Sequence, residues 1–120
     1  MKILIVEDEL NLLHLITYAL MELGGHEVAA AEVGETALRF IQEGFQPDLV
    51  ILDLRMPGIG GRAVLAQVRM QFPDLPIIIT SGESASVIAS LMALHDNYRI
   101  AALAKPYRLS ELEALIEQLK

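Results

Sequence analysis

Apolar residues along the chain gather in short uninterrupted runs, each followed by polar residues or a turn signal. Fully buried strands of a parallel sheet read in this way, whereas half-buried strands alternate between apolar and polar residues. The runs therefore predict strands at Lys2–Val6, Leu49–Leu52, Ile77–Ser81 and Ile100–Ala104. The segment His26–Ala31 is less apolar and is predicted as an edge strand.

Helix-like segments lie between these runs and after the last one. They predict helices at Leu10–Leu23, Glu35–Gln42, Arg62–Gln71, Ala85–Leu94 and Ser110–Lys120. Gly24, Gly44 and Pro73 stand just past three of them, where glycine and proline commonly end a helix. Because strand and helix alternate strictly, we expect an α/β fold with a parallel sheet covered on both faces.

The apolar residues of the first predicted helix recur at helical spacing. Leu12, Ile16, Leu20 and Leu23 fit a single stripe, which would place Leu13 on the outer side. A surface helix of a globular protein buries one such stripe against the core and exposes the remaining positions. We therefore expect those four side chains to face the sheet.

Composition narrows the class of protein. The chain has 120 residues, 53% of them hydrophobic, which suits one globular domain spanning residues 1–120. A net charge of −7 argues against direct binding to nucleic acid. The chain has no cysteine, which excludes disulfides and thiolate metal sites. No segment reads as a signal peptide or a membrane span, so we expect a cytoplasmic protein with no membrane contact.

Charged residues stand at the ends of three predicted strands. Glu7 and Asp8 follow the first strand, Asp53 follows Leu52, and Lys105 follows the last strand. Open α/β sheets bind ligands at the carboxyl ends of their strands, so these side chains are expected to converge. Three carboxylates in one cleft repel each other unless a cation joins them. Mg²⁺ prefers such oxygen ligands and usually binds together with a phosphate, so the sequence predicts a magnesium site.

Asp53 is the candidate nucleophile, because a carboxylate can accept a phosphoryl group to form an aspartyl phosphate. Lys105 would offer positive charge to the phosphoryl oxygens, and a hydroxyl from either Thr80 or Ser81 would donate a hydrogen bond to them. Each residue alone has an ordinary interpretation as a cap or loop residue. Their shared position at strand ends favours phosphoryl chemistry, since no glycine-rich phosphate loop follows the first strand.

Four motifs make the chain resemble the receiver domain of bacterial two-component response regulators over its whole length. They are Ile5–Glu9, Leu52–Gly58 with Gly61 following, Pro76–Gly82, and Lys105–Tyr107. The resemblance implies a flavodoxin-like (βα)5 fold, with a five-stranded parallel sheet in the order 2-1-3-4-5 and helices on both faces.

The resemblance also implies roles for individual residues. Asp53 would accept phosphate from a phosphohistidine of a sensor histidine kinase or a histidine phosphotransfer protein. Asp8 and Asp53 would bind Mg²⁺ directly and Glu7 through water, with the backbone carbonyl of Arg55 as a further ligand. The domain would be a signalling switch that catalyses its own phosphorylation and slow dephosphorylation. It would not be a turnover enzyme.

Further positions of the motifs are implied in the same way. Ser81 rather than Thr80 would supply the hydroxyl, and Lys105 would contact the phosphoryl group. Pro106 would follow a cis peptide bond. Arg55 and Glu83 match the two variable positions that tune how long the phosphate survives.

The chain departs from the receiver pattern at Ala102, where receivers usually carry a tyrosine or phenylalanine that takes part in switching. The predicted helix Ser84–Leu94 has no charged residue, although solvent-facing helices normally carry some. Its outer face is therefore a candidate contact surface for a second copy of the chain or for an effector.

Two other functions compete with phosphorylation-dependent signalling. A haloacid-dehalogenase-type phosphatase also uses an aspartyl phosphate, but it requires a second aspartate where this chain has Arg55. A degenerate receiver could act as a phosphorylation-independent binding scaffold. The scaffold is disfavoured because the carboxylates of the site, Ser81 and Lys105 are all present. It stays open because Ala102 stands where receivers carry an aromatic residue.

Overall fold

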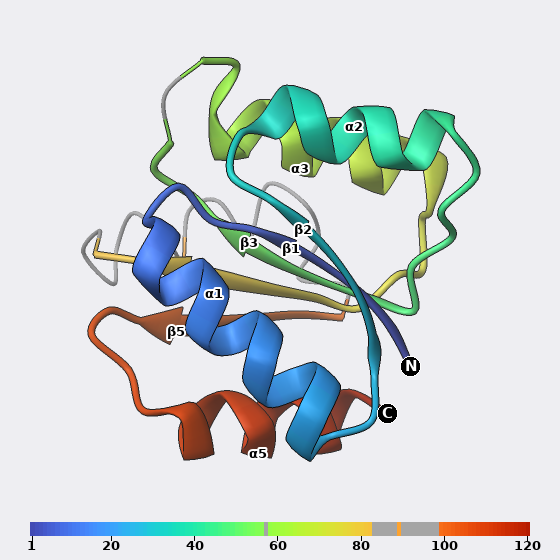
Figure 1. Cartoon of the computed structure of the whole chain (residues 1–120). Coiled ribbons are helices and arrows are strands. Elements are labelled where there is room, and N and C mark those ends of the chain that lie inside the picture. The colour runs from blue at the N-terminus through green and yellow to red at the C-terminus, as the bar shows by residue number, and fades with distance from the viewer. Residues whose placement is uncertain (57, 83–88, 90–98) are drawn as a thin grey trace.

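The computed structural model describes residues 1–56, 58–82, 89 and 99–120. All neighbouring strands of its sheet are parallel, and their order is β2-β1-β3-β4-β5 (Figure 1). This order confirms the predicted flavodoxin-like fold. The strands are β1 (Lys2–Val6), β2 (Glu27–Ala31), β3 (Leu49–Asp53), β4 (Ile77–Ser81) and β5 (Ile100–Ala104).

Helices cover both faces of the sheet. The helices α1 and α5 lie on one face, and α2 and α3 lie on the other (Figure 1). The predicted helix Ala85–Leu94 lies outside the described residues except for Ala89, which is helical and exposed. None of the helices among the described residues has the length and apolar character needed to cross a bilayer. The described helices are α1 (Leu10–Tyr18), the π-helical turn η1 (Ala19–Leu23), α2 (Gly34–Gln42), α3 (Gly60–Gln71) and α5 (Leu109–Leu119).

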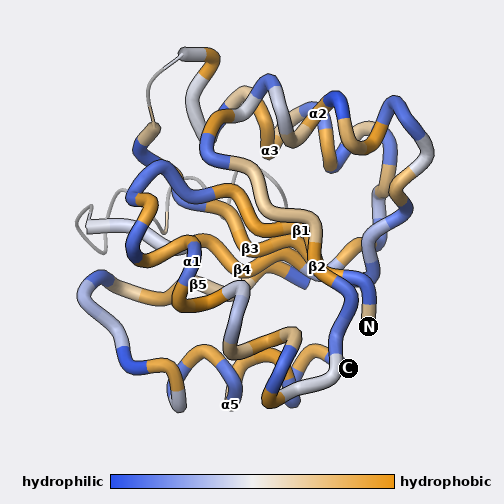
Figure 2. The backbone as a smooth tube through the Cα atoms, in the orientation of Figure 1, coloured by the Kyte–Doolittle hydropathy of each residue, from blue (hydrophilic) through white to orange (hydrophobic). Residues whose placement is uncertain are grey.

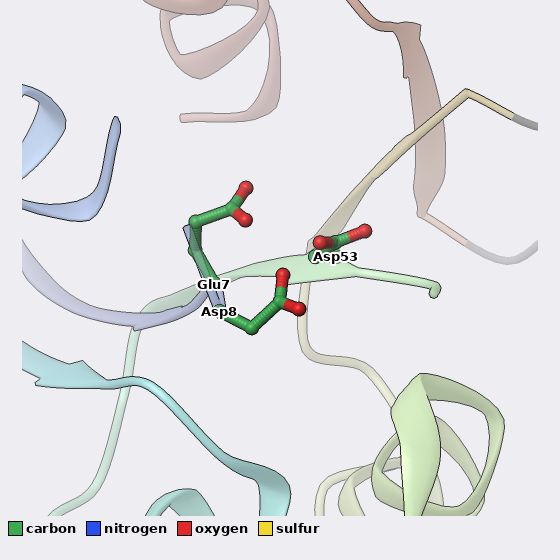
Figure 3. Close-up of side chains that lie close together, drawn as sticks. All are labelled: Glu7, Asp8 and Asp53. Carbon is green, nitrogen blue, oxygen red and sulfur yellow. The ribbon is translucent and has the colours of Figure 1, made fainter. Parts of the chain in front are cut away.

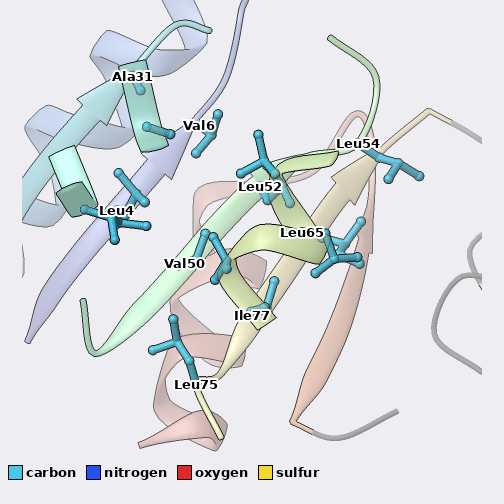
Figure 4. Packing of buried hydrophobic residues seen from close by; sticks show 14 of the residues in the cluster. Leu4, Val6, Ala31, Val50, Leu52, Leu54, Leu65, Leu75 and Ile77 are labelled. Atoms are coloured by element: carbon cyan, nitrogen blue, oxygen red, sulfur yellow. The ribbon is translucent and has the colours of Figure 1, made fainter. Parts of the chain in front are cut away.

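Successive strand residues belong to different cores because side chains alternate between the two faces of a sheet. In β3, Val50 and Leu52 pack in the core under α2 and α3 (Figure 4). Leu49 and Ile51 of the same strand pack in the core under α1 and α5. Hydrophobic residues accordingly concentrate in the central strands (Figure 2). Each fully buried aliphatic side chain contributes roughly 1.5–3 kcal/mol to stability, so this double layer holds the strand ends rigidly in place.

The first helix corrects one prediction. Leu13 is buried, with 4% of its surface exposed, whereas Leu23 is 72% exposed. The predicted stripe assumed regular α-helical spacing, but the chain turns π-helical at Ala19–Leu23. There the Gly24 N–H donates to the carbonyl of Ala19, five residues back, at 3.1 Å. This wider turn rotates Leu23 away from the core.

Candidate functional site

Three carboxylates meet where β1 and β3 end. Glu7 and Asp8 directly follow β1, and Asp53 is the last residue of β3. One carboxylate oxygen from each lies within 4.8 Å of the others (Figure 3). The pairing of Val6 with Leu52 in the sheet explains the proximity, because it brings the next residues, Glu7 and Asp53, side by side.

Lys105 joins two of these acids. Its Nζ lies 2.8 Å from Glu7 Oε1 and 3.1 Å from Asp53 Oδ2. Ile5, Ile51 and Leu103 all pack in the core under α1 and α5. The residue two positions after each of these points to the same side of the sheet, which places Glu7, Asp53 and Lys105 together. The convergence expected from strand ends therefore has a simple geometric cause.

Backbone amides hold the remaining carboxylate oxygens. The Arg55 N–H donates to Asp53 Oδ1 at 3.1 Å, and the Glu9 N–H donates to Glu7 Oε2 at 3.0 Å. Glu7 and Asp53 are buried with 2% and 3% of their surface exposed, whereas Asp8 is exposed. Both buried carboxylates thus have donors on each oxygen, as buried charges require.

The electrostatic balance of the cluster shifts two pKa values. Burial raises the pKa of Asp53 to about 6, assisted by the charge of Glu7 and opposed by the hydrogen bonds from Lys105 and the Arg55 amide. Burial lowers the pKa of Lys105, but its hydrogen bonds to Glu7 and Asp53 outweigh that effect, so its pKa lies above the usual value. Asp53 is therefore ionised at neutral pH, and Lys105 carries a full positive charge.

The donor set fits a divalent cation. Three carboxylates and one ammonium leave the cluster with a formal charge of −2, which one such ion would neutralise. The exposed carboxylate of Asp8 gives the ion access from solvent. Mg²⁺ is suited to such a site, because it binds through one or two carboxylates and retains several waters.

A glycine allows α3 to begin close to Asp53. A Cβ atom at Gly61 would collide with the backbone carbonyl oxygens of Asp53 and Leu54. The start of α3 can therefore pack directly against the end of β3, which supports the loop that contains Arg55. The sequence singled out Gly61 as part of a motif, but this steric reason became visible only in the structure.

The structure places the other predicted residues as follows. Thr80 and Ser81 are both buried, and the Ser81 carbonyl accepts a hydrogen bond from the Lys105 N–H at 2.9 Å. The choice of Ser81 as the site hydroxyl stays a prediction. The Lys105–Pro106 peptide bond is cis, as the resemblance implies. Ala102 is half-buried on β5 beside Ile79.

Arg55 has an exposed side chain, and the role of its backbone carbonyl as a metal ligand stays a prediction. Glu83 and the Ser84–Leu94 face lie outside the described residues, apart from Ala89. Tyr107, two residues after Lys105, belongs to the last motif of the sequence. Its buried hydroxyl lies within electrostatic reach of the acids, and no sequence signal indicated this.

Comparison with known proteins agrees with this fold. The sequence model of the response regulator receiver domain matches residues 3–117. The chain therefore belongs to the response regulator receiver domain family. Its relatives include the two-component response regulator PhoP of Pseudomonas aeruginosa, which is 36% identical over 121 residues, covering 99% of this chain and 51% of PhoP.

A second relative and a solved structure are also similar to this chain. The transcriptional regulatory protein PrrA of Mycobacterium tuberculosis is 35% identical over 120 residues, covering 98% of this chain and 49% of PrrA. The chain thus spans about half the length of these curated relatives. The response regulator TrrA of Thermotoga maritima, solved in complex with Mg(2+)-BeF, is 34% identical with a TM-score of 0.82, covering 99% of this chain and 98% of that one.

Proposed function

We propose that residues 1–120 act as one phosphoacceptor domain, in which Asp53 takes a phosphoryl group from a phosphohistidine of a sensor histidine kinase or phosphotransfer protein. An Asp53 oxygen attacks the phosphorus, an O–P bond forms, and the P–N bond to the imidazole breaks. The imidazole nitrogen that leaves takes a proton from solvent. The contact of Lys105 with both Asp53 and Glu7 is the observation that carries this proposal.

The residues of the site have complementary tasks in this reaction. Asp53 is ionised at neutral pH and has one oxygen held by the Arg55 amide and the other by Lys105. Lys105 is positioned to neutralise charge on the phosphoryl oxygens, which is the main requirement of phosphoryl transfer. Ser81 would donate its hydroxyl to another of those oxygens. Mg²⁺ bound by Glu7, Asp8, Asp53 and the Arg55 carbonyl would supply further positive charge.

The phosphorylated domain would then act as a switch and slowly release its phosphate. The names of PhoP and PrrA, a response regulator and a transcriptional regulator, support coupling to an effector. We propose the Ser84–Leu94 face as the contact surface for that effector or for a second copy. Ala89→Glu should then abolish a phosphorylation-dependent change in oligomer size or partner binding, with Asp53 still labelled. An unchanged response would place the output surface elsewhere.

The proposal is tested by mass spectrometry after incubation with acetyl phosphate and Mg²⁺. The expected result is one added phosphate that maps to Asp53 and disappears when the metal is chelated. Asp53→Asn is the matched control, because it keeps the shape of the side chain and removes the nucleophile. Equal labelling of Asp53→Asn would show that another residue accepts the phosphate. Complete absence of labelling in the unaltered protein would favour the binding scaffold.

A further inference from the structure

A cavity with a positively charged lining opens between the end of β3 and the start of α3. It has a volume of about 380 Å³, and both Arg55 and Arg62 line it. The other residues of its lining are apolar or are glycines: Leu54, Met56, Ile59, Gly60 and Gly61. No acid is among the described residues that line it. Because the chain as a whole has a net charge of −7, this cavity is a local exception in charge.

The arginines of the cavity are accessible to a group from outside the chain. Both have exposed side chains, and Arg62 takes part in no ion pair with the described residues. Two other exposed cations have acidic partners within the chain, since Arg39 pairs with Glu43 and Lys120 pairs with Glu117. The planar guanidinium of arginine matches a carboxylate and can donate two parallel hydrogen bonds to it. The cavity is therefore suited to a carboxylate that a partner supplies.

The position of the cavity relates it to phosphotransfer. Leu54 and Arg55 directly follow Asp53, and the Arg55 N–H donates to Asp53 Oδ1 at 3.1 Å. On the other side of the cavity, Gly61 packs so closely that a Cβ atom there would collide with the backbone carbonyl oxygen of Asp53. The cavity therefore adjoins the candidate nucleophile.

The charge of the site explains why a phosphodonor would benefit from this cavity. The three carboxylates and Lys105 have a formal charge of −2, and a phosphoryl group is itself an anion. A donor that approaches Asp53 is therefore repelled wherever bound cations do not neutralise this charge. Cations at the edge of a binding site raise the rate at which an anionic partner associates, and they make that rate depend on salt.

We propose that the cavity lined by Arg55 and Arg62 binds an acidic side chain of the protein that donates its phosphohistidine to Asp53. This inference rests on the proposed function and deepens it, because it names a charge that the phosphodonor carries near its phosphohistidine. Arg62 is the residue to change in a test. Arg55 is less suitable, because its backbone N–H holds Asp53.

The test compares phosphotransfer to Asp53 from two synthetic peptides, measured with Mg²⁺ at low salt. Each peptide carries one phosphohistidine, which is flanked by glutamates in one peptide and by glutamines in the other. The unaltered protein should have the lower KM for the glutamate peptide, although its net charge of −7 would favour the neutral peptide. Arg62→Gln should raise the KM for the glutamate peptide by about fivefold, the upper range for one exposed ion pair, and leave kcat unchanged.

Two controls separate the cavity from the overall charge of the protein. Arg39→Gln removes the same charge from α2, where the side chain is 64% exposed, and should leave the KM for both peptides unchanged. High salt should abolish the advantage of the glutamate peptide in the unaltered protein, because salt screens exposed charges. An equal KM for the glutamate peptide in Arg62→Gln and the unaltered protein would overturn the proposal. An equal rise of that KM in Arg39→Gln would overturn it too.

Phosphorylation by acetyl phosphate is measured in parallel, so that the two proposals can fail separately. Acetyl phosphate has no neighbouring acidic side chain, so it should label the unaltered protein and Arg62→Gln at the same rate. A lower rate in Arg62→Gln would place Arg62 at the phosphoryl group itself and overturn the binding of a carboxylate. If acetyl phosphate labels Asp53 but the glutamate peptide has no advantage, only the role of the cavity is wrong. If no donor labels Asp53, the proposed function fails as well.

Discussion

The interior of the three strands β1, β3 and β4 differs from their carboxyl ends in the polarity of the buried side chains. Within β1, β3 and β4 the residues are apolar and buried from both faces, as Ile5, Ile51 and Ile78 illustrate. At the carboxyl ends the chain remains buried but becomes polar. Among the described residues, the buried polar side chains are Glu7, Asp53, Thr80 and Ser81, all at this rim. The apolar interior supplies the stability that allows charged groups to be held, at a cost, where chemistry requires them.

The interior and the rim also differ in what holds each side chain. In the interior, an apolar side chain can be replaced by another of similar volume at a small cost in stability. Each rim residue depends on a particular partner: Glu7 and Asp53 share Lys105, and each accepts a backbone N–H. Removing a rim acid relieves repulsion, whereas removing an interior side chain leaves a cavity.

The sharpest contrast pairs two residues of β3. Ile51→Ala should lower the free energy of unfolding by about 2–5 kcal/mol, because it leaves a cavity in the core under α1 and α5. Asp53→Asn should leave it equal or raise it, since it removes a buried charge from an acidic cluster. Urea denaturation of the metal-free proteins measures both, with Met70→Ala, an exposed residue of α3, as a neutral control. Equal losses at the two sites would remove the distinction between interior and rim.

The second prediction concerns pH. Asp53 has a pKa of about 6 in the fold, against an ordinary value of 3.8, so the folded state holds this proton more tightly than the unfolded state does. The free energy of unfolding should therefore fall as pH rises from about 4 to about 6, by at most about 3 kcal/mol. Thermal unfolding without metal measures this fall. Asp53→Asn should lack this part of the pH dependence, and identical profiles would contradict the raised pKa.

The third prediction tests the metal cluster. Asp8→Ala should weaken Mg²⁺ binding by about tenfold to a hundredfold, or about 1.4–2.8 kcal/mol, because it removes a proposed direct ligand. Stability without metal should be equal or higher, since one of three repelling acids is gone. Titration calorimetry gives the affinity. Glu32→Ala, an exposed acid just past β2, controls for the change in net charge. Unchanged Mg²⁺ affinity in Asp8→Ala would separate Asp8 from the metal site.

The smallest predicted effect is on phosphate lifetime. Arg55→Ala should change the rate of dephosphorylation by roughly tenfold, about 1.4 kcal/mol of barrier, because Arg55 follows Asp53 by two residues, binds it through its backbone N–H and has an exposed side chain. The Arg55→Ala variant should still be phosphorylated on Asp53. Decay of the phosphorylated protein, followed by mass spectrometry, measures the rate, and Arg62→Ala provides an exposed arginine of α3 for comparison. Identical decay of Arg55→Ala and the unaltered protein would remove Arg55 from the path of the attacking water.

Local residue patterns already indicate the alternation of strands and helices and the residues that end each strand. Buried strands need apolar residues on both faces, so the runs around Ile5, Ile51 and Ile78 were recognisable locally. The rule that ligands bind at carboxyl ends then brought Glu7, Asp8, Asp53 and Lys105 together without coordinates. The strand order itself came from the family resemblance, because local patterns do not say which strands are neighbours.

The contacts between side chains of the site are visible only in the folded chain. The contacts of Lys105 with Glu7 and Asp53 and the burial that raises the pKa of Asp53 depend on distances between residues far apart in the chain. So does the condition of the Tyr107 hydroxyl, which has no hydrogen-bond partner among the described residues. Leu23 leaves the core because of the π-helical turn η1, which the regular spacing of the sequence did not predict, whereas the buried Leu13 shares a face with Ile16 in the regular helix α1. The spacing of apolar residues predicts which face of a regular helix or strand is buried. Hydrogen-bond partners and solvent exposure depend on how several elements pack together.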